Sequence, residues 1–135
     1  MLNHWSSYLH ELIEWADILS LHVHVTEETK HMINEVTLNR AKNLILVNTS
    51  RGEIVDEKAV MHAIEQKQLS YYATDVIEDE FNEDWWIKSP VIEQMLHSDY
   101  RDRIIITPHI GGMTHGARTT AFGKAVELLK GHLYD

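Results

Sequence analysis

Short apolar runs alternate along the chain with segments in which apolar residues recur every three or four positions. The runs predict strands, because a strand buried in a parallel sheet is typically a continuous stretch of Val, Ile and Leu. The run at 44–47 contains no polar residue, so we expect that strand to be covered on both faces. The four predicted strands lie at 18–22, 44–47, 71–74 and 104–106.

The helical periodicity predicts amphipathic helices before, between and after these strands. Ser6 and Ser7 suit the N-cap of the first helix, and Asp56 suits the N-cap of the third. Ser89 followed by Pro90 is typical of a fourth helix start. The apolar stripes lie at 9–16, 35–41, 60–64, 91–96 and 121–129, the last in a helix expected to end near Gly131.

Strands that alternate with helices indicate an α/β fold, since parallel strands need a crossover connection between them. Right-handed crossovers then give a four-stranded parallel sheet flanked by helices. With 135 residues, the chain is long enough for one domain and short for two.

Composition and charge exclude several classes of protein. Acidic side chains outnumber basic ones by 21 to 12, which gives a formal net charge of -9, so nucleic acid is not expected as a partner. No apolar stretch approaches the roughly 20 residues of a membrane-spanning helix, so no membrane association is expected. The chain lacks cysteine, and its first residues lack the pattern of a signal peptide, so we expect a cytoplasmic location.

Polar and ionisable residues follow each predicted strand. His22 ends the first strand, 48–51 follow the second, 75–80 follow the third, and His109 follows the fourth. The carboxyl ends of parallel strands meet at one edge of a sheet, where ligands bind in open α/β folds. We therefore expect one site built from four loops.

Each of these residues also has an ordinary structural explanation. Arg51 could be a surface ion-pair partner, Asp75 a residue that caps a loop, and His109 a histidine satisfied within a turn. A guanidinium, a carboxylate and an imidazole at matching strand ends form an acid/base set with an anchor for an anion. Together they indicate chemistry near a carboxylate substrate.

Three motifs carry a resemblance to a known family: Asn48-Thr49-Ser50-Arg51-Gly52, Asp75-Val76-Ile77-Glu78-Asp79-Glu80 and Thr107-Pro108-His109-Ile110-Gly111-Gly112. They resemble the signatures of the D-isomer-specific 2-hydroxyacid dehydrogenases, and 16–23 is similar to the strand that precedes them in that family. The resemblance covers residues 9–130. It implies a partial Rossmann-like domain from an NAD-dependent oxidoreductase, with a small 2-oxoacid or 2-hydroxyacid as the substrate of hydride transfer.

The resemblance also implies roles for individual residues. His109 would be the general acid/base, and Glu80 matches the glutamate that hydrogen-bonds this histidine and favours its protonated form. Arg51 matches the arginine that holds the substrate, because its planar guanidinium can meet a carboxylate with paired hydrogen bonds. Asp75 matches an aspartate beside the nicotinamide carboxamide. Cofactor contacts are implied for His22, Val23, Thr49, Ser50, Arg51, Asp75, His109 and Gly111.

The chain departs from the family pattern mainly by what it lacks. It contains no G-x-G-x-x-G turn, and Gly111, Gly112 and Gly116 precede no βαβ unit that would make them a phosphate loop. Residues 1–135 are therefore expected to form a truncated dinucleotide-binding domain without the first βαβ unit, the glycine-rich loop or a substrate domain. We expect weak cofactor binding and no activity from this chain alone. NADP is not excluded, because the residue that would contact the ribose is absent.

The missing first strand has a structural consequence. In the doubly wound strand order it would pair with 18–22, which instead becomes an exposed edge and predicts self-association there. Two local departures are His24 and Phe81, which stand where proline is frequent in the family. The segment 81–103, which begins without a clear period, is expected to alter substrate choice.

Two other interpretations stay open. Some relatives of the family are nucleotide-sensing regulators, so the chain could be a non-catalytic module that binds a nucleotide or a protein. The joint presence of Arg51, Glu80 and His109 favours an enzymatic origin. Ten histidines, with His22 and His24 close together, also raise the possibility of a metal site, to which we assign no residue.

Overall fold

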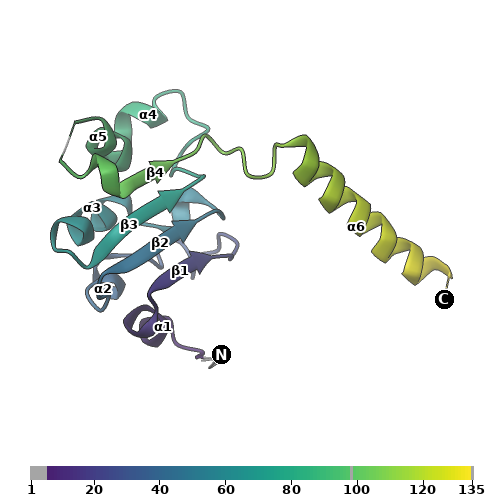
Figure 1. Ribbon diagram of the computed structural model, residues 1–135, viewed down its shortest axis with the longest axis horizontal. Coiled ribbons are helices and arrows are strands. Elements are labelled where there is room, and N and C mark those ends of the chain that lie inside the picture. Colours follow the sequence, from purple (N-terminus) through teal and green to yellow (C-terminus); the bar gives the residue numbers. More distant parts are fainter. Residues whose placement is uncertain (1–5, 98, 135) are drawn as a thin grey trace.

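The computed structural model describes residues 6–97 and 99–134, which form an α/β fold around a parallel sheet (Figure 1). The strands are β1 (Ile18–Leu21), β2 (Leu44–Asn48), β3 (Leu69–Thr74) and β4 (Ile104–Ile106), in the spatial order β1-β2-β3-β4. All three neighbouring pairs are parallel. The four predicted strands are confirmed, although β1 ends before His22, β2 includes Asn48, and β3 begins two residues earlier than predicted.

Helices and short turns connect the strands. The helices are α1 (Leu9–Trp15), α2 (Glu35–Leu38), α3 (Glu57–Glu65), α4 (Trp85–Lys88), α5 (Pro90–His97) and α6 (His115–Tyr134), and the 3-10 turns are η1 (Gly52–Ile54) and η2 (Arg101–Arg103). Asp56 caps α3 as predicted, because its side chain accepts hydrogen bonds from the amides of Lys58 and Ala59. Ser89 precedes α5 as predicted, and its Oγ accepts a hydrogen bond from the Ile92 amide.

Three details of the helices correct the sequence prediction. The N-cap of α1 is Tyr8, because the Ser6 hydroxyl binds the Tyr8 amide before the helix begins. Helix α4 forms where no element was predicted, since a single turn is too short to show a period. Helix α6 begins at His115, before its apolar stripe, and runs past Gly131, because glycine lowers helix propensity without forbidding a helix.

The hydrophobic core lies between one face of the sheet and the helices. Helix α3 is central, because it packs against α2, α5 and β3. The largest side chains that are almost completely buried here are Ile13, Ile33, Leu38, Leu44, Leu46, Ile54, Ile64, Leu69 and Tyr72. These side chains come from alternate positions of the strands, from the inner stripes of the helices and, for Ile33 and Ile54, from the segment before α2 and from η1.

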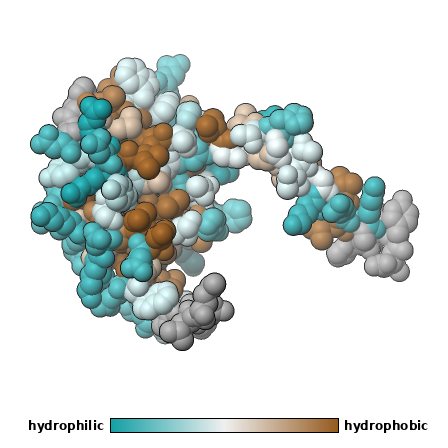
Figure 2. Space-filling view, viewed as in Figure 1, coloured by the Kyte–Doolittle hydropathy of each residue, from teal (hydrophilic) through white to brown (hydrophobic). Residues whose placement is uncertain are grey.

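None of the helices in the described part of the chain covers the opposite face of the sheet, which contradicts the expectation that 44–47 would be covered on both faces. Ile18, Tyr71 and Ile105 are 62%, 46% and 57% exposed, and Ile45 and Val47 are only half-buried. Figure 2 looks onto this face and shows an apolar patch over the strands. The strand order explains the difference: strands added in one direction through right-handed crossovers place every connecting helix on the same face.

Helix α6 lies apart from this body. The segment that follows β4 leads away from the sheet, and α6 projects beyond it without covering either face (Figure 1). Phe122 and Leu128 on this helix are 70% and 66% exposed. Within the described ranges, no helix is both long and apolar enough to cross a membrane.

Candidate active site

The loop that follows β2 is fixed by the buried side chain of Asn48. The Asn48 amide donates a hydrogen bond to the carbonyl of Arg51 (2.8 Å), and its oxygen accepts one from the amide of Ser50 (3.1 Å). The Ser50 hydroxyl donates to the carbonyl of Leu21 at the end of β1 (2.8 Å). These contacts join the ends of β1 and β2 and hold Arg51 at the carboxyl edge of the sheet, where its side chain is exposed.

Gly52 brings the Arg51 loop against the loop that carries Glu80. A Cβ atom at Gly52 would lie 2.1 Å from the carbonyl carbon of Ile77 and 2.2 Å from the amide nitrogen of Glu78. Only glycine allows the two backbones to approach so closely. The guanidinium of Arg51 and the carboxylate of Glu80 therefore stand on loops that are in direct backbone contact.

Asp75, which follows β3, holds the loop that contains His109. Its carboxylate accepts hydrogen bonds from the Thr107 hydroxyl, the Ile110 amide (3.0 Å) and the Gly111 amide (2.8 Å). Burial acts to raise the pKa of Asp75, but these hydrogen bonds outweigh it and the pKa lies below its ordinary value. Asp75 thus caps this loop, which is the structural role considered for it from the sequence.

His109 and Glu80 form a direct pair. The Nδ1 atom of His109 lies 2.5 Å from Oε1 of Glu80, whose other oxygen accepts a hydrogen bond from the Ile77 amide (3.3 Å). His109 has a φ of 52°, a left-handed conformation that costs energy for a residue with a side chain and is maintained here by the surrounding contacts. Among the described residues nothing hydrogen-bonds Nε2 of His109, so this nitrogen is available to a ligand.

The remaining predicted residues lie at the same edge of the sheet. His22 and Val23 follow β1, and both are exposed, although Nε2 of His22 lies 2.9 Å from the Ser20 hydroxyl. Thr49 is exposed at the end of β2. In the part of the chain that the structure describes, no group of three or more His, Asp or Glu residues could hold a metal ion.

An apolar cleft of about 650 Å³ adjoins the imidazole of His109. Phe81, Trp85 and Met113 line it together with Ile92 and Met95 of α5, and the ring of Phe81 lies 6.3 Å from that of His109. Sequence reasoning did not find this cleft, because 81–87 shows no period and its aromatic residues carry no motif.

The residues present suit one end of a dinucleotide. Asp75 accepts three hydrogen bonds from the His109 loop, whereas a carboxylate has about four acceptor positions, so it can still accept one from a carboxamide. Thr49 and Nε2 of His109 lie at the same edge of the sheet. The sequence contains no glycine-rich turn at a helix N-terminus that would hold a pyrophosphate. The chain therefore fits the nicotinamide end of the cofactor and not its phosphates.

A parallel α/β sheet with ionisable groups at the carboxyl ends of its strands is the architecture of nucleotide-binding domains. A histidine held by a glutamate adds a proton-transfer group to this architecture. The sequence matches the family described as D-isomer specific 2-hydroxyacid dehydrogenase, NAD binding domain, over residues 3–111. The chain belongs to this family, with residues 3–111 matching its NAD-binding domain, so the resemblance drawn from the motifs is confirmed.

Individual relatives agree with this assignment. A 2-hydroxyacid dehydrogenase homolog from Zymomonas mobilis is 43% identical over 83% of this chain and 33% of its own length. The D-lactate dehydrogenase of Lactobacillus delbrueckii subsp. bulgaricus is 35% identical over 91% of this chain and 39% of its own length. The chain thus spans between about a third and two fifths of the length of these curated relatives.

Solved structures support the same fold. The D-lactate dehydrogenase from Aquifex aeolicus, solved in complex with NAD and lactic acid, matches this chain with a TM-score of 0.65 and 31% identity. The match covers 94% of this chain and 40% of that enzyme. The four-stranded sheet and its flanking helices are therefore those of a Rossmann-like domain.

Proposed function

We propose that this chain is part of an NAD-dependent oxidoreductase that interconverts D-2-hydroxyacids and 2-oxoacids. The observation that carries the proposal is the 2.5 Å contact between His109 and Glu80, next to the loop that bears Arg51. When bound, the cofactor supplies or accepts the hydride at C2 of the substrate. Residues of this chain then transfer the proton and bind the substrate carboxylate.

His109 acts as the general acid/base. Because Nδ1 is held by Glu80, Nε2 is the atom that gives a proton to the keto oxygen during reduction and takes it back during oxidation. The hydrogen bond between Nδ1 and the carboxylate of Glu80 fixes the orientation of the ring. The left-handed backbone at His109, held through Asp75, aims the ring toward the edge of the sheet.

Arg51 binds the carboxylate of the substrate. Its guanidinium offers paired donors that match a carboxylate, and the side chain is exposed at the edge where a small acid would arrive. Its Nη1 donates a hydrogen bond to the Ser50 carbonyl (2.7 Å), which restrains the guanidinium and leaves Nε and Nη2 as the paired donors. A lysine would supply charge without this planar geometry.

The nicotinamide end of NAD contacts the same strand ends. We assign these contacts to His22, Val23, Thr49, Ser50, Arg51, Asp75, His109 and Gly111. The phosphates and the adenosine ribose have no matching residues in 1–135, so binding by this chain alone is weak and the choice between NAD and NADP is made elsewhere. Turnover therefore depends on parts of the fold that the family supplies outside this segment.

A hybrid enzyme tests the proposal. The segment of the Aquifex D-lactate dehydrogenase that matches this chain is replaced by the chain, and NADH oxidation is followed with a panel of 2-oxoacids. We expect turnover, and we expect His109→Gln in the hybrid to lower kcat by about two orders of magnitude or more. A hybrid that folds and binds NADH but reduces no 2-oxoacid, or that is unaffected by His109→Gln, contradicts the proposal.

A further inference from the structure

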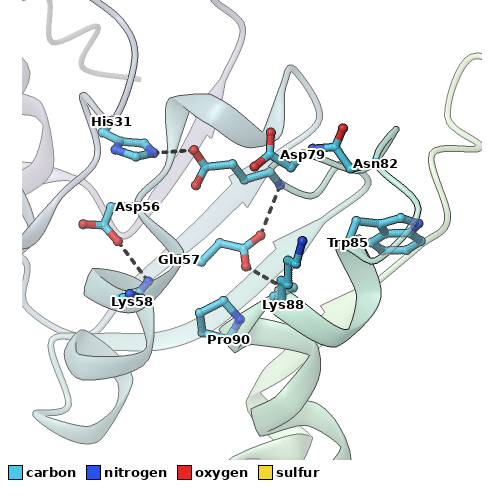
Figure 3. A pocket seen from close by; sticks show the side chains of 11 residues that line it. His31, Asp56, Glu57, Lys58, Asp79, Asn82, Trp85, Lys88 and Pro90 are labelled. Atoms are coloured by element: carbon cyan, nitrogen blue, oxygen red, sulfur yellow. Dashed lines mark hydrogen bonds and ion pairs between the residues drawn. The ribbon is translucent and has the colours of Figure 1, made fainter.

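A second polar cluster includes Glu78 and Asp79, the two residues that precede Glu80 (Figure 3). It surrounds a cavity of about 360 Å³ where the first turns of α3 and α5 meet the loop after β3. Its lining includes Glu57, Glu78 and Ser89, and none of these residues takes part in the proton transfer described above. Glu57 is the most buried charged side chain of the cluster, with 5% of its surface exposed.

Glu57 is the first residue of α3 but does not cap that helix, because Asp56 already does so. Its carboxylate instead connects two other elements. Oε1 accepts a hydrogen bond from the amide of Glu78 (3.2 Å), and Oε2 accepts one from the Ser89 hydroxyl at the start of α5 (2.5 Å). Both contacts are drawn as dashed lines in Figure 3. The side chain thus links α3, α5 and the loop after β3.

This carboxylate is buried at a net cost. Burial raises the pKa of Glu57, and the hydrogen bonds from Ser89 and from the amides of Glu78 and Val91 oppose the rise only in part. Burying a charge costs solvation free energy that its hydrogen bonds must offset, so such a charge is weak evidence of a gain in stability. A carboxylate kept in this position therefore fits a positional role better than a contribution to stability.

The loop that Glu57 holds is the one that presents Glu80. The Glu80 amide donates to the carbonyl of Ile77 (3.3 Å), and a Glu80 side-chain oxygen accepts from the Ile77 amide (3.3 Å), so 77–80 is a closed turn. Within the turn, the Glu78 side chain lies 2.7 Å from Nε2 of His31. Asp79 has a φ of 58°, which fixes the turn further. The position of the Glu78 backbone therefore sets the direction of the Glu80 side chain.

We propose that Glu57 is a positioning residue for the His109–Glu80 pair: by holding the Glu78 backbone against α3 and α5, its carboxylate keeps Glu80 within hydrogen-bond distance of Nδ1 of His109. The importance of Glu57 for catalysis rests on the proposed function, whereas its contacts with the Glu78 amide and the Ser89 hydroxyl do not. Glu57 touches neither substrate nor cofactor.

The test follows the imidazole Nδ1 proton of His109 by NMR on the isotopically labelled chain at neutral pH. A proton held by Glu80 is shifted downfield and exchanges slowly with water, and Glu80→Gln identifies its signal. We expect the Nδ1 proton of His109 to exchange about ten-fold faster or more in Glu57→Ala, because the substitution removes roughly one hydrogen bond's worth of stabilisation from the Glu78 loop. Glu57→Gln keeps one acceptor oxygen and is expected to restore most of the protection. Glu65→Ala, at an exposed position of the same helix, is the matched control.

Slow amide exchange in β2 shows that each variant is folded. If Glu57→Ala does not fold, Ser89→Ala takes its place: it removes the hydroxyl that binds Oε2, together with the bond that this hydroxyl accepts from the Ile92 amide. A folded Glu57→Ala chain, or Ser89→Ala chain, whose His109 signal exchanges within about two-fold of the wild-type rate overturns the inference. The signal does not depend on turnover, so an inactive hybrid enzyme with an intact Glu57 effect would refute the proposed function alone.

Discussion

Asp75→Asn tests the link between β3 and the His109 loop. The wild-type carboxylate accepts from the Thr107 hydroxyl and from the amides of Ile110 and Gly111. An asparagine keeps one acceptor oxygen and turns an NH2 group toward at least one of these donors. Hydrogen bonds to charged groups contribute about 1.5–3 kcal/mol each. Because Ile110 is 46% exposed and water can replace part of the loss, we expect a cost of about 2–4 kcal/mol, borne mainly by the loop.

Native-state hydrogen exchange measures this cost at the amides of Ile110 and Gly111. A loss of about 2 kcal/mol corresponds to roughly thirty-fold faster exchange. Asp79→Asn is the matched control, because Asp79 is exposed and asparagine tolerates its left-handed backbone. Equal protection of the two amides in wild-type and Asp75→Asn chains would refute the assignment of Asp75 as the anchor of the His109 loop.

The same contact has a defined pH dependence. The pKa of Asp75 is lower in the folded chain than its ordinary value, so its contribution to stability is present above the ordinary value of about 4. The contribution is lost as the pH falls through the lower, folded pKa. In the wild-type chain, the protection of the Ile110 and Gly111 amides from hydrogen exchange is therefore expected to fall in acid. In Asp75→Asn, the part of this fall that comes from the carboxylate should be absent.

Three further outcomes are expected. Gly52→Ala forces a Cβ into the Ile77 backbone and should lower the free energy of unfolding in urea by at least about 2 kcal/mol. Gly116→Ala, whose Cβ meets open space, should not lower it, and equal effects of the two substitutions would contradict the close approach of the two loops. Burial raises the pKa of Tyr72 to about 12, so the free energy of unfolding should fall by about 2–3 kcal/mol between pH 10 and 12. Tyr72→Phe should remove this loss and Tyr71→Phe should not. A loss that survives Tyr72→Phe would rule out Tyr72 as its source. The outer edge of β1, at the end of the sheet, should pair with a second copy of the chain, so sedimentation should show association that depends on concentration. Ser20→Pro should reduce this association, and a wild-type chain that stays monomeric would exclude the pairing.

Much of the fold could be predicted from the sequence because the strands are short apolar runs. In a chain of this length, runs as apolar as 104–106 are expected to be buried strands, and the parallel order follows from the helices between them. The open face of the sheet could not be predicted in this way. Periodicity shows that 44–47 is apolar on both sides, but not which side receives helices, which depends on the direction in which strands are added.

The site was predictable in part for a related reason. Residues at the ends of parallel strands converge on one edge, so the shared location followed from topology, whereas the pairing of Glu80 with His109 was implied by the family resemblance. Glu57 was not predictable, because a glutamate at a helix start usually interacts with the helix dipole in solvent. Its burial depends on the packing of three elements that are distant in sequence.

The claim that Arg51 and His109 belong to one substrate site is tested most directly by titrating the labelled chain with oxamate, the amide analogue of a 2-oxoacid. The 15N resonances of Arg51 Nε and His109 Nε2 report on the two groups in a single experiment. We expect both to shift with the same apparent Kd, which Arg51→Lys weakens. A shift at one resonance without the other, at any concentration, would contradict a shared site.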